Sequence, residues 1–378
     1  MNTPSTSHDP SLGELALVFL KLGTTAFGGP AAHIAMMEDE FVRRRKWLTR
    51  EEFLDRLGAA NLIPGPSSTE MAIHIGLHKR GWKGLLVAGV CFIVPAAIMV
   101  AVIAAIYVRF GSLPRVEGVL FAVKPVVIAI IVQAFWNLGK TAIKNVWLGV
   151  IGLLSAVAYL LRAHELLILL GAALLATIPL WGKRAKRAAL LWLPAIPAAT
   201  VAGEKAPVTL TRLFVVFLKI GSVLFGSGYV LLAFLRTDFV DRLHWLNEKQ
   251  LLDAVAVGQI TPGPVFTTAT FIGYIIAGSR GAAVATVAIF LPAFLLVAIS
   301  GPIVPRIRRS KMASAALDGV IVASLALMGV VTWQLGRAAI VSWQTTTIAA
   351  ISGVLLLRFR VNSAWLILGA ALIGIVWR

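Results

Sequence analysis

The chain has 378 residues, of which 58% are hydrophobic and only 14% are charged, and its mean hydropathy is +0.87. This composition excludes an ordinary soluble protein and predicts an all-α protein that crosses the membrane several times. The net charge of +18 does not indicate a nucleic-acid partner, because the basic residues form short clusters between apolar runs, as the positive-inside rule predicts beside a lipid bilayer. The single cysteine, Cys91, excludes an intrachain disulfide.

The first half begins with an apolar segment over residues 12–27, which ends at Gly28-Gly29-Pro30. A basic cluster at residues 43–46 follows, and two pieces of about a dozen residues then flank Pro64-Gly65-Pro66. These pieces cover residues 51–62 and 67–78, and four apolar spans complete the half at 84–107, 116–138, 146–161 and 165–181. A linker rich in Pro, Ala and basic residues covers 182–210.

Neither piece beside Pro64-Gly65-Pro66 is long enough to cross ~30 Å of hydrocarbon alone. The prolines stop a continuous helix, because proline lacks the amide proton and clashes with the preceding turn. We therefore expect a re-entrant helical hairpin whose break is buried in protein or faces water. A single kinked spanning helix is the alternative. Re-entry concentrates the basic residues on one side of the membrane more strongly than spanning does, so the positive-inside rule favours it.

The second half repeats the first. FLKLGTTAFGG from Phe19 returns 198 residues later as FLKIGSVLFGS from Phe217, and the same register aligns the first Pro-Gly-Pro with Pro262-Gly263-Pro264. The matching spans lie near residues 282–303, 313–335, 339–357 and 361–377. Two tandem copies with Gly/Pro breaks at matching places are typical of a secondary transporter. We expect repeat domains at 11–181 and 211–378, joined by the linker at 182–210.

The charge bias of equivalent loops differs between the halves. In the first half basic residues crowd the loops around the hairpin, whereas in the second half acidic residues dilute that cluster and a new one, at 306–311, follows the next span. This exchange predicts an inverted repeat, each half having five transmembrane helices plus the re-entrant hairpin. The linker would be cytoplasmic and both termini outside. A version with a re-entrant first segment and four crossings per half gives the same overall charge bias but not the exchange.

The motifs FLKLGTTAFGGP, ANLIPGPSST and VGQITPGPVFTT together resemble the chromate ion transporter family, and the similarity covers nearly the whole chain as two complete family domains. The resemblance implies a multi-pass protein of the bacterial inner membrane that exports chromate and gives chromate resistance. It also implies a transporter rather than an enzyme. Short members of the family act as oppositely oriented pairs of single domains, in agreement with the inverted repeat expected above.

Chromate is a tetrahedral dianion, and broken helices can bind such an ion. The N-terminus of a half-helix presents unpaired amide protons and about half a positive charge. Ser67 is placed as an N-cap, and Ser67-x-x-Glu70 matches a capping box. The hydroxyl groups after each Pro-Gly-Pro add donors, and the glycines permit a close approach of the backbone. Packing and capping alone are the alternative role of these residues.

Lys21 and Lys219 are repeat-equivalent lysines inside apolar segments. A charge at such a position costs several kcal/mol unless it has a partner or lines a cavity, so two lysines that converge near the midplane would suit a dianion. Snorkelling of both side chains to the interface is the alternative.

Other charged residues occur in one half only. Lys124 and Asp318 lie in matching helices and are expected to pair with each other, whereas Glu70 is expected to couple proton uptake to anion release. The candidate substrate-binding residues are Lys21, Gly28, Gly29, Asn61, Pro64, Gly65, Pro66, Ser67, Ser68, Thr69, Lys219, Gly226, Ser227, Gln259, Pro262, Gly263, Pro264, Thr267 and Thr268. The coupling candidates are Glu70, Lys124, Asp318, His33 and Glu38.

Two alternatives remain open at the level of function. Sulfate or another oxyanion could be the cargo, because tetrahedral dianions differ little in size and charge. A lipid pyrophosphate phosphatase is a more distant alternative, since its motif resembles Pro64–Thr69 but its phosphate-binding arginine is missing here. No P-loop or dinucleotide motif is present, so no cofactor and no metal are expected. A homodimer is left open.

Overall fold

The computed structural model describes residues 9–110, 113–181, 207–225, 230–359 and 361–377. Over these ranges the chain is helical and has no β-strand. Four stretches are long and apolar enough to cross a membrane, at residues 67–110, 117–142, 265–300 and 311–339. Shorter apolar helices cover 146–160, 165–180 and 363–376. The expected all-α class is therefore confirmed over the described residues, and the long apolar helices are consistent with a membrane protein.

The chain forms two compact units, and each unit draws on both sequence halves. Unit 1 consists of residues 1–113, 208–228 and 254–302, and unit 2 consists of residues 114–207, 229–253 and 303–378. The two Pro-Gly-Pro breaks therefore belong to the same unit, although almost two hundred residues separate them along the chain.

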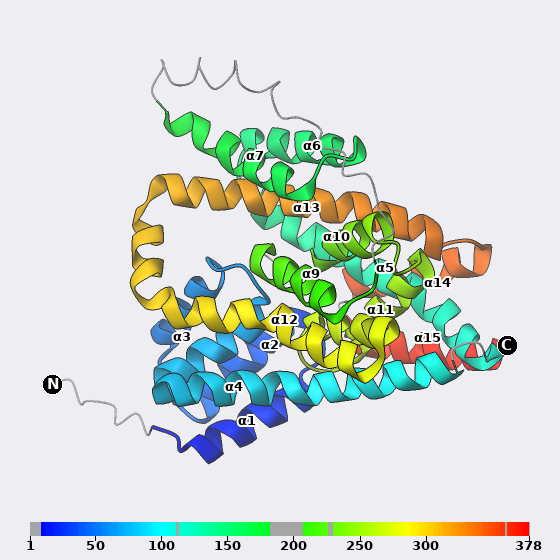
Figure 1. Cartoon of the computed structure of the whole chain (residues 1–378), viewed down its shortest axis with the longest axis horizontal. Coiled ribbons are helices and arrows are strands. Elements are labelled where there is room, and N and C mark those ends of the chain that lie inside the picture. Colours follow the sequence, from blue (N-terminus) through cyan, green and yellow to red (C-terminus); the bar gives the residue numbers. More distant parts are fainter. Residues whose placement is uncertain (1–8, 111–112, 182–206, 226–229, 360, 378) are drawn as a thin grey trace. The chain divides into compact units, whose positions relative to one another are not determined.

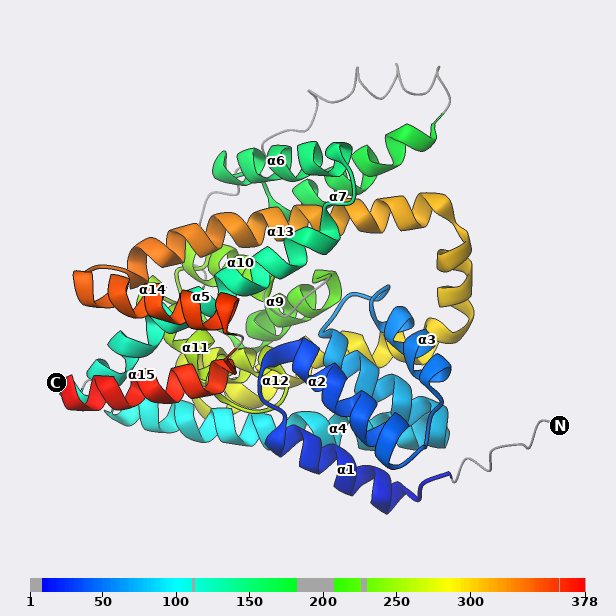
Figure 2. The same cartoon turned by 180° about the vertical axis from the view of Figure 1, so that it is seen from behind.

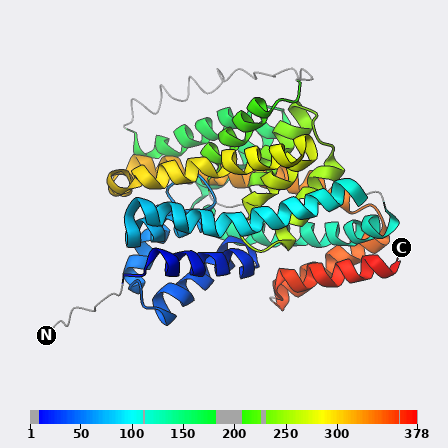
Figure 3. The ribbon, with the colours of Figure 1, turned by 60° about the horizontal axis from the view of Figure 1, so that its bottom comes forward.

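Unit 1 contains α1 (Leu12–Thr25), α2 (Gly29–Glu38), the π-helix η1 (Asp39–Arg44), α3 (Arg50–Ala60) and α4 (Ser67–Phe110), together with α9 (Leu210–Val223), η5 (Val265–Thr267) and most of α12 (Thr268–Arg309). The helix α11 (Glu248–Ile260) begins in unit 2 and ends in unit 1. A capping box at Ser11 and Glu14 starts α1, which packs along α4 (Figure 3). Buried aromatic side chains, among them Phe19, Phe41 and Phe92, form the core beneath this pair.

Both α4 and α12 fold back on themselves. The backbone leaves the helical region at Arg80 and Gly81 in α4, and at the repeat-equivalent Ala277 and Gly278 in α12. Gly81 and Gly278 have φ values of +58° and +60°, which favour glycine. Each helix is thus a half-helix joined by a tight turn to a long apolar helix. The boundary at residue 79 agrees with the piece predicted over 67–78.

Unit 2 contains α5 (Pro114–Ala142), α6 (Val146–Leu160), α7 (Glu165–Thr177), η2 (Ile178–Leu180), α10 (Leu231–Leu235) and the π-helix η4 (Arg236–Arg242), and then α13 (Lys311–Ala339), α14 (Trp343–Arg358) and α15 (Ser363–Trp377). The long helix α13 packs against α5, α6 and α7, whereas α14 and α15 pack against α5 (Figures 1 and 2). Glycine permits these crossings, as where Gly319 of α13 meets the carbonyl oxygen of Ala172 in α7.

Helix length bears on the expected number of crossings. The helix α1 has 14 residues, about 21 Å at 1.5 Å per residue, which is shorter than the ~30 Å hydrocarbon core. The helices α6, α7, α14 and α15 have between 13 and 16 residues each. The count of five crossings per half therefore stays a prediction, as does the version in which the first segment is re-entrant.

Candidate functional site

The two Pro-Gly-Pro breaks make the same hydrogen bond to the opposite repeat. The Gly65 amide donates to the Leu224 carbonyl oxygen at 2.7 Å, and the Gly263 amide donates to the Ala26 carbonyl oxygen at 2.9 Å. Gly263 is the repeat equivalent of Gly65, and Leu224 is that of Ala26. Ala26 and Leu224 are the C-caps of α1 and α9. Each break is therefore tied to the end of the other repeat's first helix.

Glycine is required at the centre of both breaks. Gly65 has a φ of +143° and Gly263 a φ of +91°, a region that residues with a side chain rarely adopt. A Cβ atom at Gly65 would clash with Oε1 of Glu70 and lie 3.7 Å from the Ala293 side chain. A Cβ atom at Gly263 would lie 2.6 Å from the side chain of Ala96, which is the repeat equivalent of Ala293. The backbone thus packs closely against the long helix of the opposite repeat.

A buried histidine links the helix after the first break to the Ala26 carbonyl oxygen. Nε2 of His33 lies 3.0 Å from the Ala26 carbonyl oxygen, to which it must donate. Nδ1 is then the acceptor, so the Ser68 hydroxyl donates to it at 3.2 Å. His33 and Ser68 are only 1% and 2% exposed. The Ala26 carbonyl oxygen therefore accepts from His33 of its own repeat and from Gly263 of the other.

Several polar atoms beside the breaks are buried without a hydrogen-bond partner. They are Oγ1 of Thr69, both carboxyl oxygens of Glu70, Nε2 of His74 and Nε2 of Gln259. Thr69 and Glu70 are 0% exposed, and Gln259 is 9% exposed. Buried polar atoms are almost always hydrogen-bonded, so such a group indicates a water, a proton or a ligand. The pieces that flank the breaks thus offer donors from Thr69 and Gln259 and a carboxyl group from Glu70.

The predicted capping box at Ser67 and Glu70 is wrong. The helix α4 begins at Ser67, and the amides of Thr69 and Glu70 both donate to the Pro66 carbonyl oxygen, at 2.7 and 3.0 Å. The Glu70 side chain makes no hydrogen bond to the backbone at Ser67. Pro66 therefore occupies the cap position, which moves Ser67 inside the helix and leaves the Glu70 carboxyl group unused by capping.

The hydroxyl groups of the second break are engaged locally. Thr267 donates to the Pro264 carbonyl oxygen and Thr268 to that of Val265, both at 2.8 Å. A hydroxyl group has one proton, so in this conformation neither threonine has a donor left for an anion. Both side chains are buried, as are those of Pro262 and Pro264. The donor role expected of Thr267 and Thr268 is therefore not available here.

The remaining candidates near the breaks differ in exposure. The Lys21 side chain is exposed on α1, whereas that of Lys219 on α9 is half-buried. Asn61 is the exposed C-cap of α3, unlike its buried repeat equivalent Gln259. Gly28 and Gly29 begin α2 with φ values of +103° and +78°. Gly226 and Ser227 lie outside the described residues. The convergence of Lys21 and Lys219 stays a prediction.

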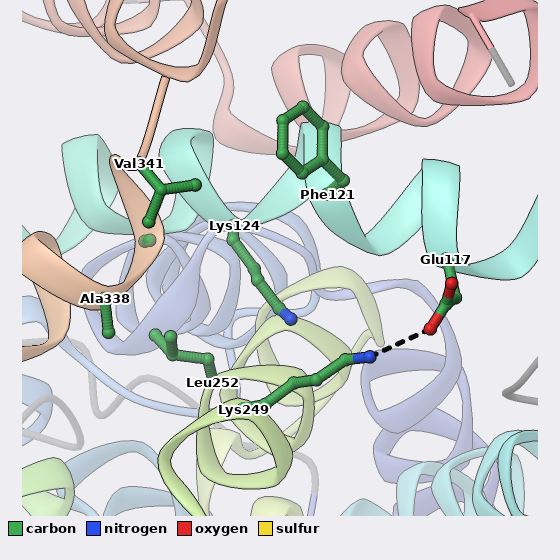
Figure 4. A pocket seen from close by; sticks show the side chains of 8 residues that line it. Glu117, Phe121, Lys124, Lys249, Leu252, Ala338 and Val341 are labelled. Carbon is green, nitrogen blue, oxygen red and sulfur yellow. Dashed lines mark hydrogen bonds and ion pairs between the residues drawn. The ribbon is translucent and has the colours of Figure 1, made fainter.

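The predicted pair of Lys124 and Asp318 is wrong. Nζ of Lys124 lies 2.9 Å from Oδ1 of Asp253, which is 0% exposed, and Asp318 instead pairs with Lys144 at 2.7 Å. Lys144 follows the C-terminal end of α5. At a rise of 1.5 Å per residue, it lies roughly 30 Å from Lys124 along the axis of this helix. The start of α13 therefore lies beside the end of α5 that is far from Lys124. Figure 4 shows Lys124 turned toward α11.

Sequence reasoning missed Asp253, because it was grouped with the acidic residues that dilute the basic loops. The structure places it inside α11 with a fully buried side chain. Its repeat equivalent, Asp55, is exposed on α3. The unmatched Lys124 was the available signal, since a lysine inside an apolar helix requires an acidic partner.

Glu38 belongs to an ion pair that the second repeat makes with exchanged charges. Glu38 lies 4.0 Å from Arg50 in the first repeat, and Arg236 lies 2.8 Å from Glu248 in the second. Arg236 is the repeat equivalent of Glu38, and Glu248 is that of Arg50. The pair links the start of the π-helix to the next α-helix in both copies. Its geometry is that of a structural link, and Glu38 is partly exposed rather than enclosed.

Comparison with known proteins assigns the chain to a family. The family model described as chromate transporter matches twice, at residues 13–177 and 211–375. A chromate transport protein of Cupriavidus metallidurans is 34% identical over 97% of this chain and 93% of its own length. A probable chromate transport protein of Synechococcus elongatus is 32% identical over 83% and 81%, respectively.

A third relative matches a shorter part of the chain. The uncharacterized transporter YwrA of Bacillus subtilis is 33% identical over 132 residues, which are 35% of this chain and 74% of its own length. No solved structure matches the chain. The two family matches start 198 residues apart, the same spacing as the repeat of FLKLGTTAFGG. The chain therefore belongs to the chromate transporter family and carries two copies of the family's domain.

Proposed function

We propose that this protein exports chromate from the cytoplasm across the inner membrane and so gives chromate resistance. The support is the double family match, together with the similarity to relatives that are named chromate transport proteins and are matched over most of their length. An inside-negative potential drives a dianion outward and releases ~4.6 kcal/mol per 100 mV, twice the single-charge value. Export therefore needs no ATP.

The observation that carries this proposal is the reciprocal bonding of the two helix breaks. It brings two glycine-centred turns and the N-terminus of α4 together within unit 1. The amides of Thr69 and Glu70 already donate to the Pro66 carbonyl oxygen, so the positive end of the α4 helix dipole is what favours an anion here. The unpaired Thr69 hydroxyl and Gln259 amide add donors. We place the oxyanion at these breaks.

Expression in a chromate-sensitive bacterium tests the direction of transport. Cells that carry the wild-type protein should accumulate less chromate and survive a higher concentration than cells with an empty vector. Equal accumulation in both strains, with the protein present in the membrane, counts against export. Sulfate is the second candidate cargo, because it has the same shape and charge, and sulfate uptake in the same cells distinguishes the two.

The carboxyl group of Glu70 is proposed to couple the anion to a proton. It is fully buried and has no donor in this conformation, and a carboxylate in that position bears the full cost of leaving water. A proton removes that cost and also removes the repulsion of an approaching dianion. Glu70→Gln mimics the protonated form, so chromate flux should persist and lose its dependence on pH.

Flux into proteoliposomes at several pH values measures this effect. Glu51→Gln is the matched control, because Glu51 is an exposed carboxylate on the adjacent α3. A Glu70→Gln variant with the same pH profile as the wild type and the control would refute the coupling role.

We also propose that the two repeats are inverted, with the linker cytoplasmic and both termini outside. The support is the equivalence of the contacts, since Gly65 and Gly263 make the same bond in both directions. Such an exchange requires a two-fold axis between the copies, and the exchanged charge bias of equivalent loops favours an axis in the membrane plane. A tag at either terminus should react with a membrane-impermeant label in intact cells, and a tag labelled only after lysis would contradict the arrangement.

A further inference from the structure

Unit 2 contains a pocket in which two lysines meet an apolar wall. Its volume is about 300 Å³, and it lies between α5, the first turns of α11 and the end of α13. Lys124 and Lys249 enter it from opposite sides, and Phe121, Leu252 and Val341 form part of the wall (Figure 4). An apolar pocket with a few convergent charged groups is the usual form of a small-ligand site.

Each lysine is held by one carboxylate. Nζ of Lys124 lies 2.9 Å from Oδ1 of Asp253, and Nζ of Lys249 lies 3.0 Å from Oε1 of Glu117. An ammonium group has three N–H donors, so a contact with one carboxylate oxygen leaves donors on each lysine. Both lysines line one space, where apolar walls strengthen electrostatic attraction.

The two carboxylates differ in their freedom to move. The Asp253 side chain is 0% exposed, and it fixes Lys124, whose own side chain is 12% exposed. The Glu117 and Lys249 side chains are 37% and 57% exposed, so this pair lies at the mouth and can separate into water at little cost. An anion that enters can therefore replace Glu117 on Lys249 while Asp253 keeps Lys124 in place.

We propose that this pocket is a second oxyanion-binding site, in which a tetrahedral dianion bridges Lys124 and Lys249 and displaces Glu117. The volume is ample, since one water takes about 30 Å³ in the liquid. The two ammonium groups supply positive charge and N–H donors to the anion's oxygens. The identity of the cargo as chromate rests on the function proposed above, whereas the site itself requires only a tetrahedral dianion.

Amine labelling tests the site without transport. In the purified wild-type protein, chromate or sulfate should slow the acetylation of Lys249 severalfold, as measured by mass spectrometry, because the bound anion covers its amine. Lys140, an exposed lysine on the same helix α5, is the internal control and should react at an unchanged rate. Protection of Lys249 that is absent with both anions overturns the proposal.

Variants distinguish an anion-binding role of the two lysines from a purely structural role of their ion pairs. Lys249→Met, and Lys124→Met combined with Asp253→Asn, which leaves no buried charge, should each raise KM for chromate flux by about tenfold or more. Glu117→Gln should lower KM, because it removes the competitor, and Lys140→Met should match the wild type. Unchanged KM in the first two variants contradicts the site while the proposed function stands. Absence of chromate flux in the wild type contradicts the proposed function. In that case, protection of Lys249 from acetylation by sulfate still tests whether the pocket binds an oxyanion.

Discussion

Lys124→Met is expected to destabilise the protein by about 3–5 kcal/mol, the usual effect of removing one partner from a buried ion pair. The Asp253 side chain is 0% exposed and would lose the ammonium group that lies 2.9 Å from its Oδ1. Thermal unfolding of the purified protein in detergent measures the loss. Addition of Asp253→Asn removes the buried negative charge and should restore most of the stability.

Lys144→Met is the matched control for this prediction. Lys144 and Asp318 form an ion pair of the same kind in the same unit, but their side chains are 56% and 23% exposed. Loss of such a pair costs no more than about 1 kcal/mol, since water solvates the remaining charge. Equal melting temperatures for Lys124→Met and Lys144→Met would show that the buried pair is not formed.

Gly263→Ala is expected to have a comparable effect, with an additional loss of transport. Alanine at a φ of +91° is strained by about 1–3 kcal/mol, and its Cβ would lie 2.6 Å from the Ala96 side chain, where overpacking costs a similar amount. The clash pushes the break away from α4 and so weakens its bond to Ala26. Melting temperature and chromate flux in proteoliposomes measure the two effects.

Gly65→Ala should be the milder change at the equivalent position. The atom it meets is Oε1 of Glu70, at the end of a side chain that can rotate away, rather than a Cβ atom fixed to a helix. Gly353→Ala is the control, because this glycine lies inside α14 with open space around it. It should leave stability equal or raise it by up to about 1 kcal/mol. A Gly263→Ala variant as stable and active as the Gly353→Ala control would contradict the close packing of the breaks.

The repeat and the helix boundaries could be predicted because both are local properties of the sequence. Pro64-Gly65-Pro66 ends α3 and precedes α4 as expected, since proline constrains its own neighbourhood whatever the tertiary structure. The capping box predicted at Ser67 was wrong because of the neighbouring proline. Pro66 took the cap position, and the motif alone does not say which of two adjacent residues does so.

The partner of Lys124 could not be predicted. Pairing depends on which helices are adjacent and on how far along each helix the two charged residues lie. Equivalence of two positions in a repeat suggested Asp318, but α13 places that residue beside Lys144. The assignment of segments to the two compact units could not be predicted either. Nothing in the register of the repeat indicates that both breaks lie in one compact unit with α1 and α9.

Flux of chromate in proteoliposomes that contain only this protein tests the central claim most directly. A potential that is negative inside the donor compartment should drive chromate out of it, and sulfate should compete. The Gly263→Ala variant should reduce that flux, whereas Gly353→Ala should not. Chromate movement no faster than in protein-free vesicles, with the folded protein present and a potential imposed, would contradict the account.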